Sequence, residues 1–265
     1  RQEMTQRLFR LVLGGDRFAP CESMEAILDV GCGDGQWAIE MAQEFPNAKV
    51  RGVNISNAFP ETGLPPNLRL LVGDPLRGLP FKPAAFDLIH QRDAALTLPF
   101  TKWHSLLKEF QRLLKPGGWI ELAEADSLLR SVGPAGERVN AWMLLAAGRR
   151  GIDLAIPRDL AVMCKDVGFV ETKIRRYATP VGDWGGTPGM YLAAGYRETL
   201  VGIKGWLVRE KATTDQDFEH VLSQWEEELQ QARTKTVYVV CCARKAPSGS
   251  TKSEVSSLTN TFKRR

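Results

Sequence analysis

The sequence is poor in the residues that build disulfide frameworks and metal centres. Its 265 residues include five cysteines and three histidines. The cysteines are odd in number, scattered and without Cys-x-x-Cys spacing, so we expect neither a disulfide framework nor a zinc site. No group of His, Asp and Glu has metal-ligand spacing, which disfavours metal-assisted chemistry. Cysteines of this kind favour a reducing compartment, and we expect a cytoplasmic protein, with the nucleus as the alternative.

Long apolar runs and a strong charge bias are also missing. No uninterrupted apolar stretch approaches the roughly 18 residues of a membrane helix, and no signal peptide is visible. The net charge of +4 comes from 35 basic and 31 acidic residues, which is too small a surplus to argue for nucleic-acid or membrane binding. The composition, 43% hydrophobic and 25% charged, is that of an ordinary globular protein. The length allows one large α/β domain or a domain with a subdomain.

The most informative stretch is residues 26–35, Ala-Ile-Leu-Asp-Val-Gly-Cys-Gly-Asp-Gly. It predicts a strand and a tight glycine turn, and residues 36–42 continue as a helix. Glycine tolerates positive φ and lets a ligand approach the backbone, and a helix N-terminus presents free N–H groups. A nucleotide-like ligand suits such a turn. The dinucleotide pattern Gly-x-Gly-x-x-Gly fails because Gln36 occupies its last position, and no P-loop ending is present.

The pattern Asp-Val-Gly-Cys-Gly-Asp-Gly instead resembles motif I of class I S-adenosylmethionine-dependent methyltransferases. A second mark of that class is Leu-Lys-Pro-Gly-Gly at 114–118, directly before an apolar strand at 119–124. The resemblance implies S-adenosylmethionine as the cofactor. It also implies an α/β fold with a Rossmann-like seven-stranded sheet. The last strand, expected over 235–243, would be antiparallel, and helical inserts would lie over the substrate side.

Several longer segments are similar to the fungal LaeA-like methyltransferases. They include Phe-Asp-Leu-Ile-His-Gln-Arg at 86–92 and the stretch from 114 to 124. The resemblance covers roughly residues 1–245 and implies a fungal source and a setting in secondary metabolism. It departs from the family at Asn54 and at Thr5-Gln6. Relatives also extend further upstream, so we expect part of an N-terminal cover to be absent.

We therefore expect one methyltransferase domain over residues 1–245, with helical inserts at about 127–151 and 182–232. Residues 246–265, rich in Ser, Thr and Lys, are expected to be disordered. A helix over residues 1–13 serves either for packing or as a cover over the cofactor. Large apolar side chains in the inserts either form a core or roof the substrate side: Trp142, Met143, Met190, Tyr191 and Trp206.

Site residues follow from the resemblance. It implies that the cofactor contacts Asp29, Gly31, Cys32, Gly33, Gly35, Trp37, Asn54, Ile55, Asp74, Pro75, Gln91 and Arg92. Asn54 stands where the family usually has an acidic residue that accepts both ribose hydroxyls. Its single carbonyl acceptor predicts weaker binding. Asp74 either accepts the adenine amine or simply begins a turn before Pro75.

His90, at the end of the strand expected over 86–90, is the candidate catalytic base. The alternative is a histidine hydrogen-bonded in the pocket wall. Gln91, Arg92 and Asp93 are candidates for lining the cofactor or substrate site. Glu124 and Asp126 either contact a polar substrate or lie in a solvated loop.

Three functions remain open. The first is methyl transfer to a small-molecule acceptor in fungal secondary metabolism. The second is a LaeA-type regulator that acts through protein partners. The third is a methyltransferase fold without productive methyl transfer, which Asn54 and the expected short N-terminus favour. A fold alone does not decide among such functions.

Overall fold

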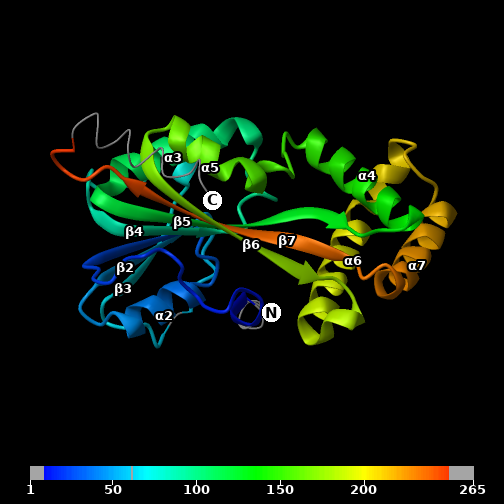
Figure 1. Cartoon of the computed structure of the whole chain (residues 1–265), viewed down its shortest axis with the longest axis horizontal. Coiled ribbons are helices and arrows are strands. Elements are labelled where there is room, and N and C mark those ends of the chain that lie inside the picture. Colours follow the sequence, from blue (N-terminus) through cyan, green and yellow to red (C-terminus); the bar gives the residue numbers. More distant parts are fainter. Residues whose placement is uncertain (1–8, 61, 251–265) are drawn as a thin grey trace.

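The computed structural model describes residues 9–60 and 62–250. Its centre is a seven-stranded sheet in the order β3-β2-β1-β4-β5-β7-β6 (Figure 1). The strands are β1 (Ala26–Val30), β2 (Lys49–Asn54), β3 (Leu68–Val72), β4 (Phe86–Arg92), β5 (Leu114–Arg130), β6 (Phe169–Pro180) and β7 (Lys235–Lys245). The first five strands pair in parallel, and β7 is antiparallel to both β5 and β6. This confirms the predicted fold class.

Helices cover both faces of the sheet. Figure 1 shows α3 and α5 on one face, and α2 with the N-terminal segment on the other. The helices are α2 (Gln36–Glu44), α3 (Phe100–Leu113), α4 (Pro134–Arg149), α5 (Ile156–Asp166), α6 (Gly186–Arg209) and α7 (Asp215–Gln231), with single 3₁₀ turns η1 (Pro75–Arg77) and η2 (Asp183–Gly185). Of the predicted N-terminal helix, residues 9–13 are helical, and residues 1–8 lie outside the described part.

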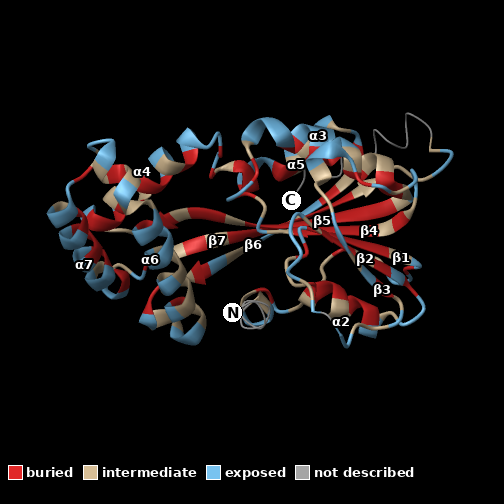
Figure 2. Ribbon diagram, turned by 180° about the vertical axis from the view of Figure 1, so that it is seen from behind, coloured by how far each residue is buried: buried red, intermediate tan, exposed pale blue. Residues whose placement is uncertain are grey.

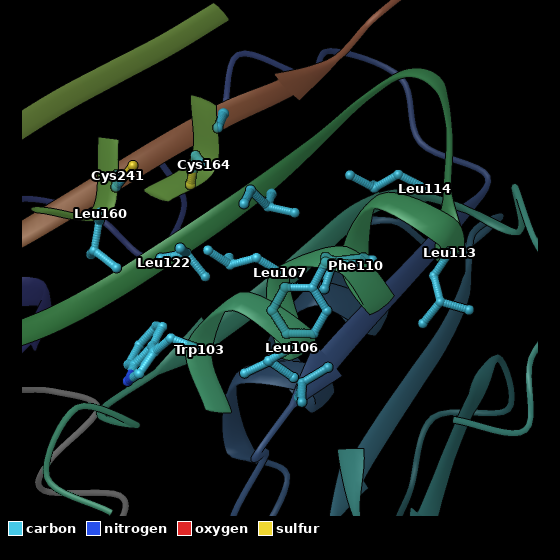
Figure 3. Packing of buried hydrophobic residues seen from close by; sticks show 14 of the residues in the cluster. Trp103, Leu106, Leu107, Phe110, Leu113, Leu114, Leu122, Leu160, Cys164 and Cys241 are labelled. Carbon is cyan, nitrogen blue, oxygen red and sulfur yellow. The ribbon is translucent and has the colours of Figure 1, made fainter. Parts of the chain in front are cut away.

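Strands β1, β4, β5 and β7 are largely buried because both of their faces carry apolar side chains, as expected for strands between helix layers. Figure 2 shows the central strands as the largest continuous buried region. On one face, Trp103, Leu107 and Phe110 of α3 are fully buried against the sheet (Figure 3). On the other face, Trp37 and Met41 of α2 pack with the N-terminal segment. These two cores fix the carboxyl ends of the strands between them.

A third core lies outside the sheet proper. Helices α4, α6 and α7 pack on one another at the far end of the long strands, and we call them the helical lobe (Figure 1). Trp142 and Met143 are buried in this core, whereas Met190 is 54% exposed. Trp142 and Met143 therefore serve packing within the lobe. Thr214 caps α7 by accepting a hydrogen bond from the Asp217 N–H at 3.1 Å, as threonine commonly does at a helix N-terminus.

The structure corrects the predicted end of strand five. We expected it to stop near residue 124 and an insert to begin at 127. Instead β5 runs to Arg130, because its ladder with β7 continues to the pair Arg130–Lys235. Glu124 and Asp126 are therefore not in a solvated loop but inside a strand, and both are buried. Of the tail predicted to be disordered, residues 246–250 are described and form a turn, while residues 251–265 lie outside the described part.

Candidate functional site

A cavity of about 530 Å³ opens at the carboxyl ends of β1, β2 and β4. Ligands of open α/β sheets bind at this edge. Of the predicted site residues, the lining includes Asp29, Gly31, Cys32, Gly33, Trp37, Asn54, Ile55, Asp74, Pro75, His90, Gln91 and Arg92. The sheet thus brings together residues that lie far apart in the sequence. None of the described residues of the helical lobe lines this cavity, so α3 and the loop at 93–99 form its remaining wall.

The glycine turn after β1 forms the floor of the cavity. Gly31 and Cys32 donate their backbone N–H groups to the Val53 carbonyl at 2.8 and 3.1 Å, which ties the turn to β2. Gly33, at φ +59°, lines the cavity. Gly35, at φ +87°, does not: a Cβ there would lie 2.7 Å from a Leu70 methyl carbon. Gly35 is therefore needed for close packing of the turn against Leu70. It is not among the residues that line the cavity, so the structure does not support its predicted contact with a cofactor.

His90 and Asp29 form a buried pair in the cavity wall. His90 Nδ1 lies 2.8 Å from Asp29 Oδ1, and both side chains are at most 4% exposed. Trp37 stacks on the imidazole with ring centroids 3.8 Å apart, and its indole N–H donates to the Asp16 carbonyl at 2.7 Å. Nδ1 of the imidazole is therefore occupied by its contact with Asp29, and Trp37 covers one face of the ring. The geometry fits the wall alternative well, and the role of His90 as a base stays a prediction.

Glu121, which we did not single out from the sequence, lies beside this pair. In the ladders, Asp29 pairs with His90 and His90 with Glu121, so the three neighbours share one face of the sheet. Glu121 Oε2 accepts hydrogen bonds from the Phe18 and Ala19 N–H groups, both at 2.6 Å. Burial raises the pKa of its carboxyl. A lone glutamate inside the apolar run Trp-Ile-Glu-Leu-Ala is the sequence signal that points to such a buried role.

Asn54 and Asp74 stand at neighbouring strand ends. Asn54 Nδ2 donates to the Ser56 carbonyl at 3.0 Å, which leaves the Asn54 carbonyl oxygen as its acceptor for a ligand. Asp74 Oδ1 accepts from the Leu76 N–H at 2.9 Å and so caps η1. The turn-initiating alternative for Asp74 is therefore present in the structure. Its contact with an adenine stays a prediction.

The end of β4 carries a second polar group of residues. Gln91 is buried and donates to Glu124 Oε1 at 3.3 Å, and Glu124 Oε2 accepts from the Ala95 N–H at 2.8 Å. Burial raises the pKa of Glu124 to about 8, and the nearby Asp93 charge adds to the rise. The Arg92 guanidinium lies 4.3 Å from the ring centroid of Phe9 in the N-terminal helix. Residues 9–13 therefore pack against a residue that lines the cavity but do not line it themselves, and the role of this helix as a cover stays a prediction.

Comparison with known proteins adds the family. A family model described as a methyltransferase domain matches residues 2–173. The chain belongs to this methyltransferase domain family. The resemblance predicted from the glycine turn and the Leu-Lys-Pro-Gly-Gly segment is thereby confirmed.

The relatives of this methyltransferase domain protein include fungal proteins. Methyltransferase str2 of Strobilurus tenacellus is 40% identical over 100 residues, which are 38% of this chain and 35% of the relative. The secondary metabolism regulator LAE1 of Cochliobolus heterostrophus is 33% identical over 177 residues, or 61% of this chain and 54% of the relative. The alignments thus span about a third to a half of these relatives. A solved structure of a geranyl diphosphate methyltransferase with S-adenosylmethionine has a TM-score of 0.55 at 17% identity, covering 92% of this chain and 87% of the other, and shows the shared fold.

The described residues contain no helix with both the length and the apolar character that crossing a bilayer requires.

Proposed function

We propose that this chain transfers a methyl group from S-adenosylmethionine to a small-molecule acceptor of fungal secondary metabolism. The observation that carries the proposal is the 530 Å³ cavity, which joins the glycine turn to polar side chains at three strand ends. The family membership and the fungal relatives support it. An enzyme of this kind would work in the cytoplasm.

The cavity fits the chemistry of the cofactor. S-adenosylmethionine carries hydrogen-bond donors on its ribose, its adenine and its ammonium group. The chain offers acceptors at Asn54, Asp74 and Asp29, which all line the cavity. A Cβ on Gly31 would meet no atom within 4 Å, so the backbone is open to a ligand there. Ile55, 70% exposed, supplies apolar surface next to Asn54.

The chain contributes binding and orientation. When bound, S-adenosylmethionine supplies a methyl group that is open to attack by a nucleophile. The residues that we propose to hold it are Asp29, Gly31, Cys32, Gly33, Trp37, Asn54, Ile55, Asp74, Pro75, Gln91 and Arg92. His90 fixes the orientation of Asp29 through their 2.8 Å contact. Holding both reactants in one geometry is worth several kcal/mol in such a reaction.

Calorimetric titration with S-adenosylmethionine and, separately, S-adenosylhomocysteine tests the proposal. Micromolar binding of either ligand is the expected result. Absence of binding at millimolar ligand, in a folded sample of the chain, would reject the cofactor site and with it the methyl transfer.

The likeness to LAE1 favours a second candidate, a regulator of secondary metabolism that acts through protein partners in the nucleus. Such a regulator would act with or without measurable methyl transfer, so complementation tests the regulatory role and a variant in the glycine turn tests whether that role needs the cofactor. A fungal strain lacking its own LaeA-type regulator would be complemented with the wild-type chain and with Gly33→Val. Restoration of metabolite production by both chains would favour a partner role without methyl transfer. Restoration by neither would leave the small-molecule enzyme as the supported function.

A further inference from the structure

Asp93, the first residue after β4, has an unusual backbone conformation at the cavity. Its φ is +58°, in the left-handed region, which costs a residue other than glycine roughly 1 kcal/mol and which asparagine adopts at least as readily. Its N–H donates to the Ala123 carbonyl at 3.0 Å and holds the turn in place. The backbone alone therefore gives no reason for a carboxylate at this position.

The Asp93 carboxylate has a partner that serves both of its protonation states. Tyr238 Oη of β7 lies 2.8 Å from Asp93 Oδ1 and 2.9 Å from the Ala123 carbonyl oxygen. When Asp93 is ionised, the Tyr238 hydroxyl donates to it. When Asp93 is protonated at Oδ2, its Oδ1 still accepts the hydrogen bond from the Tyr238 hydroxyl. The group can thus gain or lose a proton without leaving a polar atom unpaired.

The other Asp93 oxygen is available to a ligand. Asp93 lines the cavity, and within residues 9–60 and 62–250 no donor is hydrogen-bonded to its Oδ2. The charged and titratable groups that face it are Arg92 and His90 of β4, Glu124 of β5 and Tyr238 of β7. The surrounding protein raises the pKa of the Asp93 carboxyl, while Arg92 and the Tyr238 hydroxyl oppose the rise.

We propose that Asp93 accepts the proton of a hydroxyl group on the methyl acceptor. This rests on the proposed function. As the acceptor oxygen forms its bond to the methyl carbon, the carbon–sulfur bond breaks with its electron pair on sulfur. The hydroxyl proton moves to Asp93 Oδ2, and the products are an ether and a thioether. Asp93 then returns the proton to water.

The positive charge of Arg92 favours a hydroxyl group over an amine as the methyl acceptor. Arg92 precedes Asp93 in the chain and lines the same cavity, and its charge lowers the pKa of the Asp93 carboxyl. A positive charge there stabilises the negative charge that develops on a hydroxyl oxygen and disfavours an ammonium group. Compared with His90, whose Nδ1 contacts Asp29 and whose ring is covered by Trp37, Asp93 has the more accessible proton-accepting atom.

The test uses 4-nitrophenol, whose neutral and ionised forms absorb at different wavelengths. Its binding to the full chain is measured in the presence of S-adenosylhomocysteine across the pH range in which the phenol ionises. The proteins are wild type, Asp93→Asn and, as a matched control, Asp153→Asn, which removes an exposed carboxylate outside the cavity. Asparagine keeps an acceptor for the Tyr238 hydroxyl and tolerates the left-handed backbone, so we expect Asp93→Asn to fold.

Relative to wild type and Asp153→Asn, Asp93→Asn should shift the ratio of the two affinities about tenfold toward the phenolate, because it lacks the carboxylate that repels the anion while Arg92 is present in all three proteins. Asp93→Asn should keep its affinity for S-adenosylhomocysteine. Equal preferences in wild type and Asp93→Asn would overturn the proposal. So would phenol binding by neither protein while S-adenosylhomocysteine still binds. A misfolded Asp93→Asn would show a structural role for the carboxylate and overturn it as well. If S-adenosylhomocysteine itself does not bind, the proposed function fails, and the inference fails with it.

Discussion

Replacing Glu124 with glutamine should change how stability depends on pH. Glu124 is fully buried, accepts a hydrogen bond from the Ala95 N–H and contacts the Gln91 amide. Burial raises its pKa from 4.5 to about 8. Glutamine has the same shape and keeps an acceptor for Ala95, and the Gln91 amide can turn its oxygen toward the new NH₂ group. The substitution therefore removes the ionisation while it keeps the packing.

The sign of the effect follows from proton binding. Above the ordinary pKa of 4.5, the unfolded chain has lost the Glu124 proton, but the folded chain retains it up to about pH 8. The folded state therefore binds more protons, so the free energy of unfolding falls as pH rises through this window. At about 1.4 kcal/mol per pH unit, the raised pKa of Glu124 should lower the free energy of unfolding by about 4 kcal/mol as the pH rises from about 5 to 8. Structural relaxation around the ion makes this an upper bound.

Urea unfolding of wild type and Glu124→Gln at both pH values measures the effect. The free energy of unfolding of Glu124→Gln minus that of wild type should be several kcal/mol larger at pH 8 than at about pH 5. Glu22→Gln, which alters an exposed carboxylate, serves as the control. Its free energy of unfolding should differ from that of wild type by the same amount at both pH values. If the two differences for Glu124→Gln agree within about 1 kcal/mol, then Glu124 is ionised in the folded protein at neutral pH, and the reasoning from its burial is wrong.

Three further substitutions test other parts of the structure. Gly33→Val should abolish measurable S-adenosylhomocysteine binding by calorimetry because its side chain enters the cavity. Gly63→Val, also at positive φ but outside the cavity lining, controls for backbone strain. Equal affinities of the two variants for S-adenosylhomocysteine would show that the glycine turn does not contact the ligand. Asn54→Asp should tighten the cofactor about fivefold, since a charged acceptor strengthens a hydrogen bond by about 1 kcal/mol, and unchanged or weaker binding would refute the ribose contact. Glu228→Ala removes the acceptor for the Ala135 and Gly136 N–H groups at the start of α4. It should lower the free energy of unfolding by about 1–3 kcal/mol with cofactor affinity retained, and a loss of affinity would show that the helical lobe acts on the cavity.

The sequence by itself determined the features that depend on local chemistry. The glycine turn, the Leu-Lys-Pro-Gly-Gly segment and the apolar strands predicted the fold class and the edge of the sheet where the cavity lies. The cap at Thr214 was also predictable, because a cap involves only neighbouring residues. Periodicity and turn residues report on the chain within a few positions, and these elements need nothing more.

Only the tertiary structure decided which polar residues meet. The contact of Asp29 with His90 crosses two strands that lie 61 positions apart in the sequence. Glu124 read equally well as a solvated loop residue, and its burial follows from the extension of β5 along β7. Asp93 gained its partner from β7, 145 residues away. Proton affinity depends on burial and on charges in space, and these become defined only when distant strands pair.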